Sequence, residues 1–268
     1  MIKCDMHLHT DNSADCNEPM ENTVESAIEK GIEVLAFTDH CDLTYFDIRD
    51  NDKSIGEAFK QAENLRKKYK DKIKILSGIE LGEYVYNKNL GDYMLKSFDY
   101  DVVIASIHVR RDNTVFSFTD YSKEKEADIN ELLEEYFEDL YELSQNMDYD
   151  ILAHLNIPYR YINGKYKRGF DSREFDEIIT KILKTVIKRE KALEINTSGI
   201  ATFGTLFPDE WIVEKYYDLG GRIITIGADA HVSHHVGLNF AKTEEYLKKV
   251  GFTGYNYFEK RKRKFIEF

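Results

Sequence analysis

The sequence contains few of the residues that mark linkers, disulfide scaffolds or membrane spans. It has only three prolines and no serine- or glycine-rich stretch, which argues against a disordered linker. Its three cysteines, Cys4, Cys16 and Cys41, form no CxxC pair and fit reduced cytosolic thiols. No apolar run is long enough to cross a bilayer, and no apolar signal segment precedes the first strand-like run. We therefore expect a cytoplasmic protein with one domain over residues 1–268 and no membrane partner.

Basic residues are also scarcer than acidic ones. There are 37 Lys and Arg residues against 49 Asp and Glu residues, which gives a net charge of -12. Such a chain repels polyanions, so nucleic acid is not an expected partner, and an anionic substrate must be captured locally by metal ions or a few basic residues. The basic run at residues 260–264 fits either a nucleic-acid-binding tail or a solvated terminus, and the acidic chain favours the second.

The pattern of hydrophobic residues is that of an α/β barrel. The chain has 268 residues, 42% of them hydrophobic, which suits one such barrel. Apolar strand-like runs alternate with amphipathic stretches, as in parallel βα units. Seven strands are predicted near residues 2–8, 33–38, 73–79, 101–107, 150–153, 191–196 and 222–228. Helices are predicted near residues 20–30, 54–70, 124–146, 172–189, 208–219 and 238–249.

Two connections look different from the others. Residues 83–100 have only a weak helical period, so the third βα connection is expected to be short or irregular. Residues 155–171 are rich in polar residues and glycine, and we expect a long loop there. Long loops on the active face of a barrel commonly carry substrate contacts.

Six of the eight histidines follow strand-like runs: His7, His9, His40, His108, His154 and His231. Carboxylates occupy equivalent places, at Asp15, Asp39, Glu80 and Asp229. In a closed parallel barrel the carboxyl ends of the strands converge on one face, where such barrels keep their chemistry. The sequence therefore predicts a polynuclear metal site on that face.

Each of these residues also has an ordinary structural interpretation. Asp39 could cap a turn, and Glu80 could form a salt bridge at the barrel rim. His108 and His154 could be core histidines bonded to backbone carbonyls. Taken together, however, six imidazoles and several carboxylates buried at one barrel mouth would be costly to desolvate unless cations compensated them. The complete set therefore favours metal ligation.

The ligand types favour hydrolysis. Mixed imidazole and carboxylate ligands suit Zn, Mn or Fe and leave positions open for water, which is then acidic enough to supply hydroxide near neutral pH. Arg160 in the long loop is the best-placed residue for holding a phosphate, although a solvated loop arginine fits equally well. Tyr161 could cover an aromatic ring of a substrate. Weaker candidates for substrate contacts are Arg110, Arg111, Lys165, Lys167, Arg168, Asn196, Thr197 and Ser198.

The motifs DMHLHT with Asp15, FTDH, GIE, ASIH, LAH, EINTSG and GADAH stand in this order across nearly the whole chain. Together they resemble the PHP (polymerase and histidinol phosphatase) family, and most closely its histidinol-phosphate phosphatases. The resemblance implies a distorted seven-stranded (β/α)7 barrel, similar to a TIM barrel, with a trinuclear metal centre. Asp15 stands where some members have histidine, which keeps a ligand but adds a negative charge.

The resemblance also implies a ligand set of two or three divalent ions of Zn, Mn or Fe. By motif, one ion would take His7, His9, Glu80 and Asp229. A second would take Asp15, His40 and His231. A third would share Glu80 and take His108 and His154.

The activity implied by the resemblance is hydrolysis of L-histidinol phosphate to L-histidinol and phosphate, a step of histidine biosynthesis. Metal-bound hydroxide would attack phosphorus in line, Arg160 would hold the nonbridging oxygens, and Asp229 or His231 would handle protons. Tyr161 and Ser198 complete the expected substrate contacts. Two alternatives stay open: a phosphoesterase acting on phosphotyrosine or small nucleotides, and a metal-binding module without catalysis. The complete ligand set and the absence of a polymerase segment count against the module.

Overall fold

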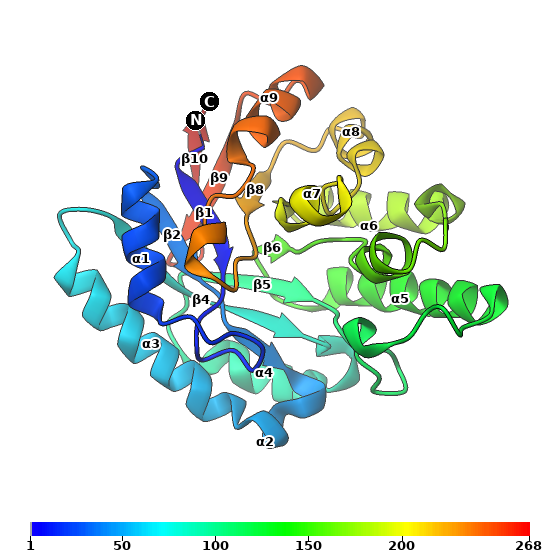
Figure 1. Ribbon diagram of the computed structural model, residues 1–268, viewed down its shortest axis with the longest axis horizontal. Helices are drawn as coiled ribbons and strands as arrows, with labels where there is room; N and C mark the ends of the chain where they lie inside the picture. The colour runs from blue at the N-terminus through cyan, green and yellow to red at the C-terminus, as the bar shows by residue number, and fades with distance from the viewer. Residues whose placement is uncertain (1) are drawn as a thin grey trace.

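The computed structural model describes residues 2–268, except for the side chains at positions 201 and 202. A sheet of parallel strands, surrounded by helices, forms its centre (Figure 1). The sheet has the strand order β1-β2-β4-β5-β6-β7-β8, and the short strand β3 pairs with β4. The bounds of these strands are β1 Cys4–Leu8, β2 Val34–Phe37, β3 His40–Asp42, β4 Lys74–Gly82, β5 Val102–Ser106, β6 Ile151–Leu152, β7 Ala192–Asn196 and β8 Ile224–Gly227.

The sheet closes into a barrel at one end. Strands β1 and β8 meet through a parallel bridge between Leu8 and Ala230, just beyond the end of β8. The amide of His9 donates to the carbonyl of Ala230 at 3.0 Å, and the amide of Asp229 donates to the carbonyl of His7 at 2.8 Å. Closure thus occurs at the carboxyl ends of the strands, where the histidines lie. The predicted distorted (β/α)7 barrel is confirmed.

All six predicted helices are present, with additional short ones between them. The bounds of the helices are α1 Met20–Glu29, α2 Phe46–Arg49, α3 Asn51–Lys68, α4 Lys88–Ser97, α5 Glu126–Asn146, α6 Asp176–Lys188, α7 Ser198–Phe203, α8 Glu210–Asp218 and α9 Phe240–Val250. None of the helices in the described part of the chain is both long and apolar enough to span a membrane.

The two connections singled out in the sequence contain more regular structure than expected. The third connection holds helix α4, whose first turn is capped where the Asn87 side chain accepts from the amide of Leu90 at 3.2 Å. Two residues of α4, Gly91 and Met94, are buried, so the expected irregular connection is a regular helix packed on the barrel. The long loop after β6 contains one wide helical turn, Arg160–Lys165.

The chain ends in an antiparallel hairpin, of strands β9 Gly254–Glu259 and β10 Lys262–Glu267. The basic residues 262–264 are exposed, as expected for a solvated terminus, but they belong to a regular strand. The hairpin tip is fixed to the barrel, because the amide of Lys260 donates to Asp101 Oδ1 at 3.0 Å and the amide of Arg261 donates to the Asp101 carbonyl at 2.9 Å. The two strands are neighbours in the sequence, joined at residues 260–261, and the sequence analysis did not predict them.

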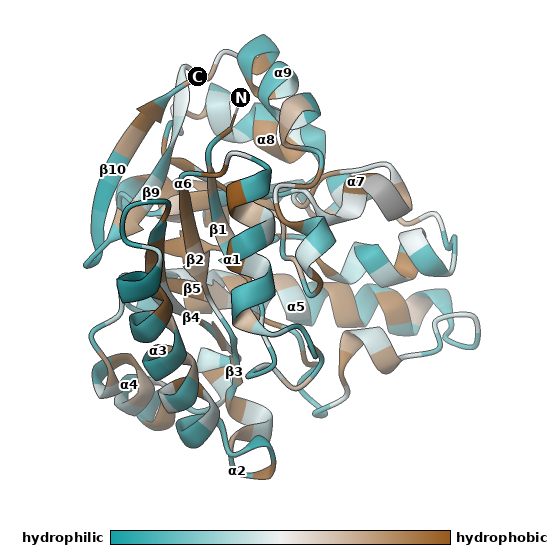
Figure 2. Ribbon diagram, turned by 60° about the vertical axis from the view of Figure 1, so that its left-hand side comes forward, coloured by the Kyte–Doolittle hydropathy of each residue, from teal (hydrophilic) through white to brown (hydrophobic). Residues whose placement is uncertain are grey.

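Packing of the strands explains their sequences. The strands of the barrel are predominantly apolar, as the hydropathy colouring shows (Figure 2). Strands β1, β2, β5, β7 and β8 are buried along their whole length. Strands covered on both sides read as continuous apolar runs rather than alternating ones. Buried polar residues within these runs therefore stand out as candidates for function.

Candidate metal centre

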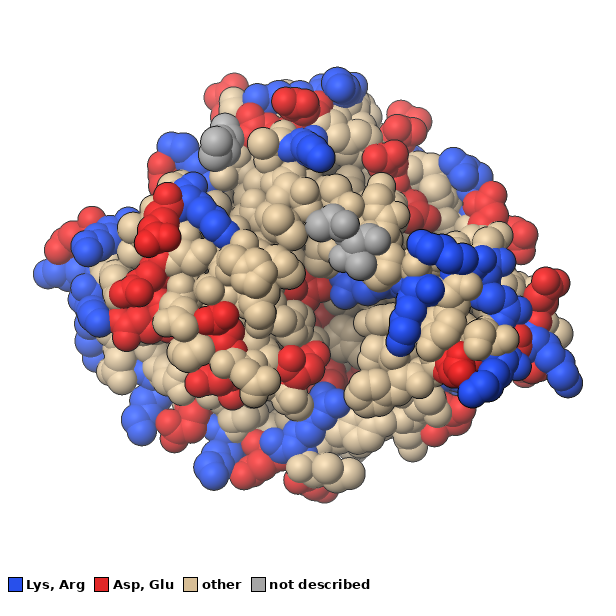
Figure 3. Space-filling view, in the orientation of Figure 1, with Lys and Arg blue, Asp and Glu red and all other residues tan. Residues whose placement is uncertain are grey.

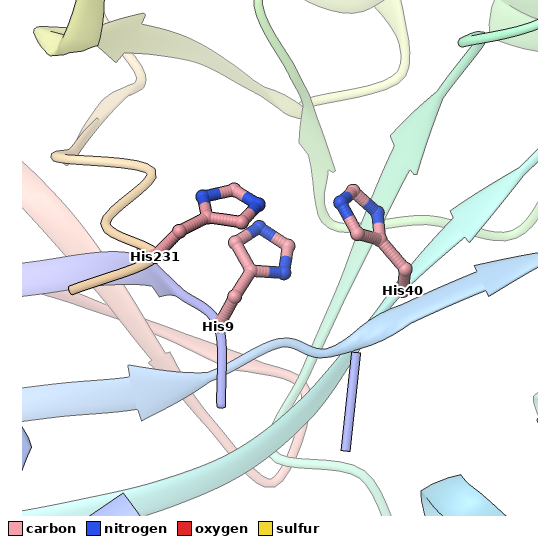
Figure 4. Close-up of side chains that lie close together, drawn as sticks. All are labelled: His9, His40 and His231. Carbon is pink, nitrogen blue, oxygen red and sulfur yellow. The ribbon is translucent and has the colours of Figure 1, made fainter. Parts of the chain in front are cut away.

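The structure brings six histidine rings together at the carboxyl ends of the strands. The ring of His9 lies 4.2 Å, centroid to centroid, from the rings of both His40 and His231. These three rings point toward one another from three separate segments (Figure 4). The ring of His108 lies 4.9 Å from that of His40 and 5.2 Å from that of His154. Strand closure alone therefore assembles the cluster that the sequence predicted.

Glu80 lies at the centre of the cluster and is completely buried. Its Oε2 atom is 2.8 Å from His40 Nδ1 and 3.2 Å from His7 Nε2. Its Oε1 atom is 2.9 Å from His154 Nε2 and 3.2 Å from His108 Nε2. His9 Nε2 also lies 3.6 Å from Oε2, so one carboxylate faces five imidazoles, an arrangement typical of a ligand that bridges metal ions and unlike a salt bridge at the rim.

A second carboxylate, Asp229, completes the inner part of the cluster. Its Oδ1 atom lies 3.3 Å from His9 Nε2 and 4.0 Å from His7 Nε2. The backbone of Asp229 is left-handed, with φ of 51°, a conformation that aspartate tolerates better than most residues. This turn directly after β8 carries the carboxylate to the histidine pair of β1.

Asp15 lies at the outer edge of the cluster, with its side chain 61% exposed. Its Oδ2 atom is 3.6 Å from His40 Nε2 and 3.4 Å from His231 Nε2. Asp15, His40 and His231 therefore form an outer group next to the buried inner one. The outer group is open to solvent and the inner group is closed.

The electrostatics of the cluster attract positive charge. Burial alone would raise the pKa of Glu80, but His108, His7 and His40 outweigh it and hold this pKa well below its ordinary value. Burial alone would lower the pKa of His40, but Glu80 and Asp15 outweigh it and raise this pKa well above its ordinary value. A field that stabilises a proton on an imidazole also stabilises a metal cation in its place.

Several buried atoms of the cluster make no well-oriented hydrogen bond among the described residues, although His40 Nδ1 and Glu80 Oε2 lie within ion-pair distance of each other. The buried atoms are His7 Nε2, His9 Nε2, His40 Nδ1, His154 Nδ1 and Glu80 Oε2. Burial, followed by the neighbouring His40 and His231, lowers the pKa of His9 to about 3, so this imidazole is neutral and offers a lone pair. Buried polar atoms without partners are rare in proteins, and here they belong to donor types that zinc, manganese and iron prefer. The residues therefore fit a bound group of metal ions.

A layer of residues around the cluster holds the histidines in place, and the sequence analysis did not single it out. Glu194 Oε1 lies 2.6 Å from His7 Nδ1, and Asp42 Oδ1 lies 3.2 Å from His108 Nδ1. Glu83 Oε1 accepts from the amide of His108 at 2.8 Å. A buried glutamate inside the apolar strand ALEIN was the available sequence signal for Glu194.

Asp39 does not belong to the cluster but supports the turn next to it. Its Oδ1 atom accepts from the Thr10 amide at 2.7 Å and from the Ser13 hydroxyl at 2.7 Å. Ser13 Oγ in turn lies 3.2 Å from His9 Nδ1. Asp39 thus fixes the turn after β1 and, through Ser13, the ring of His9, which agrees with the turn-capping interpretation of this residue.

Arg160 lies at the edge of the cluster. Its Nη2 atom is 3.1 Å from Asp229 Oδ2 and also contacts Ser198 Oγ, while its guanidinium lies 5.1 Å from the centre of the Phe207 ring. Arg160 and Tyr161 line a cavity together with Asp15, Asp229 and the outer histidines. In the space-filling view this face is hollowed near its centre, with acidic side chains around part of the hollow (Figure 3).

Most of the weaker candidates have structural partners instead. Arg111 Nη2 donates to Asp139 Oδ1 at 2.8 Å, and Arg168 contacts the backbone carbonyls of Tyr121 and Glu124. Thr197 Oγ1 donates to the carbonyl of Leu238 at 2.8 Å. Asn196 and Ser198 are the exceptions, because Asn196 Nδ2 donates to Asp229 Oδ2 at 3.2 Å and Ser198 Oγ contacts Arg160.

Fold and site together define a class of protein: a parallel barrel with a metal-binding cluster at the carboxyl ends of its strands. Within that class the chain belongs to the PHP domain family, whose profile matches residues 5–198. This match covers β1 to β7 and every cluster residue except Asp229 and His231.

Relatives with known names match nearly the whole chain. A histidinol-phosphatase of Lactococcus lactis is 34% identical over 261 residues, which cover 94% of this chain and 93% of the relative. A probable histidinol-phosphatase of Thermotoga maritima is 34% identical over 253 residues, which cover 92% of each. The crystal structure of the Lactococcus lactis histidinol phosphate phosphatase with zinc, L-histidinol and phosphate superposes with a TM-score of 0.80, 29% identity and 98% coverage of both chains.

Proposed function

We propose that this chain is a metal-dependent phosphomonoesterase that hydrolyses L-histidinol phosphate to L-histidinol and phosphate. The observation that carries the proposal is the juxtaposition of the buried imidazole and carboxylate cluster with Arg160, in one cavity. The Lactococcus lactis relative, similar over nearly its whole length, was crystallised with zinc, L-histidinol and phosphate. The cluster, Arg160 and the family membership all support the hydrolysis of a phosphomonoester.

We assign the metal ligands to three groups on the basis of their distances. His7, His9, Glu80 and Asp229 form the first group, with their facing atoms 3.2 to 4.0 Å apart. Asp15, His40 and His231 form the second. Glu80, His108 and His154 form the third. Two or three divalent ions of Zn, Mn or Fe fit this set, because imidazole and carboxylate ligands suit all three metals.

The metal ions, when bound, would lower the pKa of water and neutralise charge on phosphoryl oxygens. The chain's own residues do the rest. Arg160 offers a planar guanidinium to the nonbridging oxygens, and its contact with Asp229 aims it at the cluster. Ser198 holds the same guanidinium from another side, and Tyr161 lines the cavity where the organic part of a substrate lies.

Two residues are placed to move protons during hydrolysis. His231 is 31% exposed, and its Nδ1 lies 3.7 Å from Asp229 Oδ1. This pair connects the buried groups with solvent, whereas His7 and His9 are fully enclosed. We assign proton transfer to Asp229 and His231 for that reason.

A substrate panel tests the proposal. Steady-state kcat/KM of the metal-loaded protein is measured for L-histidinol phosphate, phosphotyrosine, nucleoside monophosphates and p-nitrophenyl phosphate. We expect the highest value for L-histidinol phosphate. A higher kcat/KM for phosphotyrosine or for a nucleotide would contradict the proposed substrate. If the protein binds metal but hydrolyses none of the esters, the chain would be a metal-binding module without catalysis.

A further inference from the structure

The C-terminal hairpin has a free edge. Strand β10 pairs with β9 on one side only, and in Figure 2 it lies at the outside of the molecule. Its residues are mostly exposed, including Phe265, whose exposed fraction is 57%. Exposed edge strands are templates for pairing with another strand, and proteins usually protect them.

The register of the hairpin determines which backbone groups point outward. Phe268 pairs across the hairpin by donating its amide to the Thr253 carbonyl at 3.1 Å, and the turn at residues 260–261 joins the facing residues Glu259 and Lys262. Hydrogen-bonded and non-hydrogen-bonded pairs alternate in an antiparallel ladder. The even-numbered residues of β10 therefore bond to β9, and the amides and carbonyls of Arg263, Phe265 and Glu267 point to the free edge.

These outward groups have no hydrogen-bond partner in residues 2–268. The hairpin cannot bend to cover these groups, because Asp101 accepts hydrogen bonds from two backbone amides at the hairpin tip. Strand β9, on the inner side, is anchored as well, since Asn256 donates to the carbonyl of Ile224 at 3.1 Å. The free edge of β10 is thus held rigid and accessible.

We propose that β10 pairs with β10 of a second copy of this chain, antiparallel and about a twofold axis at Phe265. Such an axis places Arg263 opposite Glu267 of the second copy, twice, and Phe265 opposite its own equivalent. Both ion pairs and the aromatic pair use residues whose backbone groups point outward. The result is one continuous sheet of four strands, β9-β10-β10-β9.

Charge complementarity selects this register and this partner. An axis at Lys264 would place two Lys264 side chains opposite each other, and an axis at Ile266 would place Glu267 opposite Phe265. Among axes within β10, only the one at Phe265 places oppositely charged residues of the strand across from each other, and it also places Lys264 opposite Ile266. The chain's net charge of -12 opposes association at long range, but physiological salt screens it beyond about 8 Å, whereas paired strands are in direct contact.

Charge reversal at the two paired positions tests the proposal. The oligomeric state of the full chain is measured by sedimentation velocity in physiological salt, from low micromolar to near-millimolar concentrations. Arg263→Glu and Glu267→Arg each place like charges opposite each other, and each should weaken dimerisation on the order of tenfold. Lys184→Glu, which makes an equal charge change on the exposed face of α6, is the matched control and should dimerise like wild type.

Two further measurements make the test specific. A mixture of Arg263→Glu and Glu267→Arg chains should form a heterodimer, because both cross-strand pairs are then attractive. The amides of Arg263, Phe265 and Glu267 should exchange slowly with solvent only in the dimer, whereas the amides of residues 264 and 266 should be protected in monomer and dimer alike. A wild-type chain that remains monomeric at every concentration, or a dimer that neither substitution weakens, would overturn the proposal.

Discussion

His7 and Glu194 form a buried contact beneath the metal cluster, with 2.6 Å between His7 Nδ1 and Glu194 Oε1. Glu194 Oε2 also accepts from the amide of His154 at 2.8 Å. One carboxylate therefore orients two of the assigned ligands. A carboxylate behind a ligating histidine fixes its tautomer and its ring orientation, so that Nε2 faces the metal.

We predict that Glu194→Gln weakens metal binding more than it changes the chemistry. The amide of glutamine can replace only one of the two acceptor oxygens, so either His7 or the His154 amide loses its partner. Loss of such a contact typically lowers metal affinity roughly 10- to 100-fold. In metal titrations, the variant should need a higher metal concentration than wild type for half-maximal activity and half-maximal metal binding. Its activity at saturating metal should be nearly normal. Glu177→Gln, on the exposed surface of α6, is the control, and equal titration curves for the two variants would contradict the prediction.

Removal of metal should inactivate and destabilise the protein. Without cations, buried atoms of the cluster such as His7 Nε2 and His9 Nε2 have no hydrogen-bond partner among the described residues. A metal ion at 100 times its dissociation constant stabilises the folded state by roughly 2.7 kcal/mol per site. We expect two or three equivalents of metal by elemental analysis, loss of activity and a lower Tm after chelation, and recovery with Zn, Mn or Fe. Full activity of metal-free protein would refute the site.

Substitution of cluster residues should abolish hydrolysis without unfolding the chain. Glu80→Gln removes the carboxylate that faces five imidazoles, and His9→Asn removes a ring at the junction of the inner and outer groups. His234 is exposed in the loop after β8 and serves as the control. We expect His234→Ala to keep most of kcat/KM, with circular dichroism showing similar folds for all three variants. An equal loss of kcat/KM in His234→Ala and His9→Asn would show that our division of the histidines into ligands and non-ligands is wrong.

Arg160→Ala should lower kcat/KM for every phosphomonoester by a similar factor. A charge-assisted hydrogen bond contributes about 1.5 to 3 kcal/mol, which corresponds to roughly a 10- to 100-fold loss. L-histidinol phosphate and p-nitrophenyl phosphate share only the phosphate, so equal losses identify the group that Arg160 recognises. Arg160→Lys keeps the charge without the planar fork and should recover part of the rate. Unchanged kcat/KM for both esters in Arg160→Ala would remove this residue from the site.

The native protein should resist alkylation at all three thiols. Cys4, Cys16 and Cys41 are buried, and burial raises the pKa of each thiol, that of Cys16 to about 11. A raised pKa lowers the thiolate fraction at pH 8, and the thiolate is the reactive form. Mass spectrometry after iodoacetamide treatment should find no modified cysteine in the folded protein and three in the unfolded chain. Rapid modification of the folded protein at any of them would contradict the burial.

Patterns in the sequence were enough to predict the barrel and the convergence of the histidine and carboxylate cluster. Long apolar runs that alternate with amphipathic helices leave few other folds, and residues such as His108 and His154 mark strand ends simply by following those runs. Because parallel strands end on the same face, order along the chain is enough to predict that these residues converge. This information is local, so it can be read without the structure.

How these residues group, and which side chains support them, could be seen only in the folded chain. Glu194 and His7 are 187 positions apart, and the role of Glu194 depends on β8, which lies between β7 and β1 and closes the barrel. The attachment of the β9–β10 hairpin tip to the barrel likewise depends on Asp101, far away in the sequence. Such contacts are formed by strand register and barrel closure, which depend on the packing of the whole chain and leave no periodic signal in any one segment.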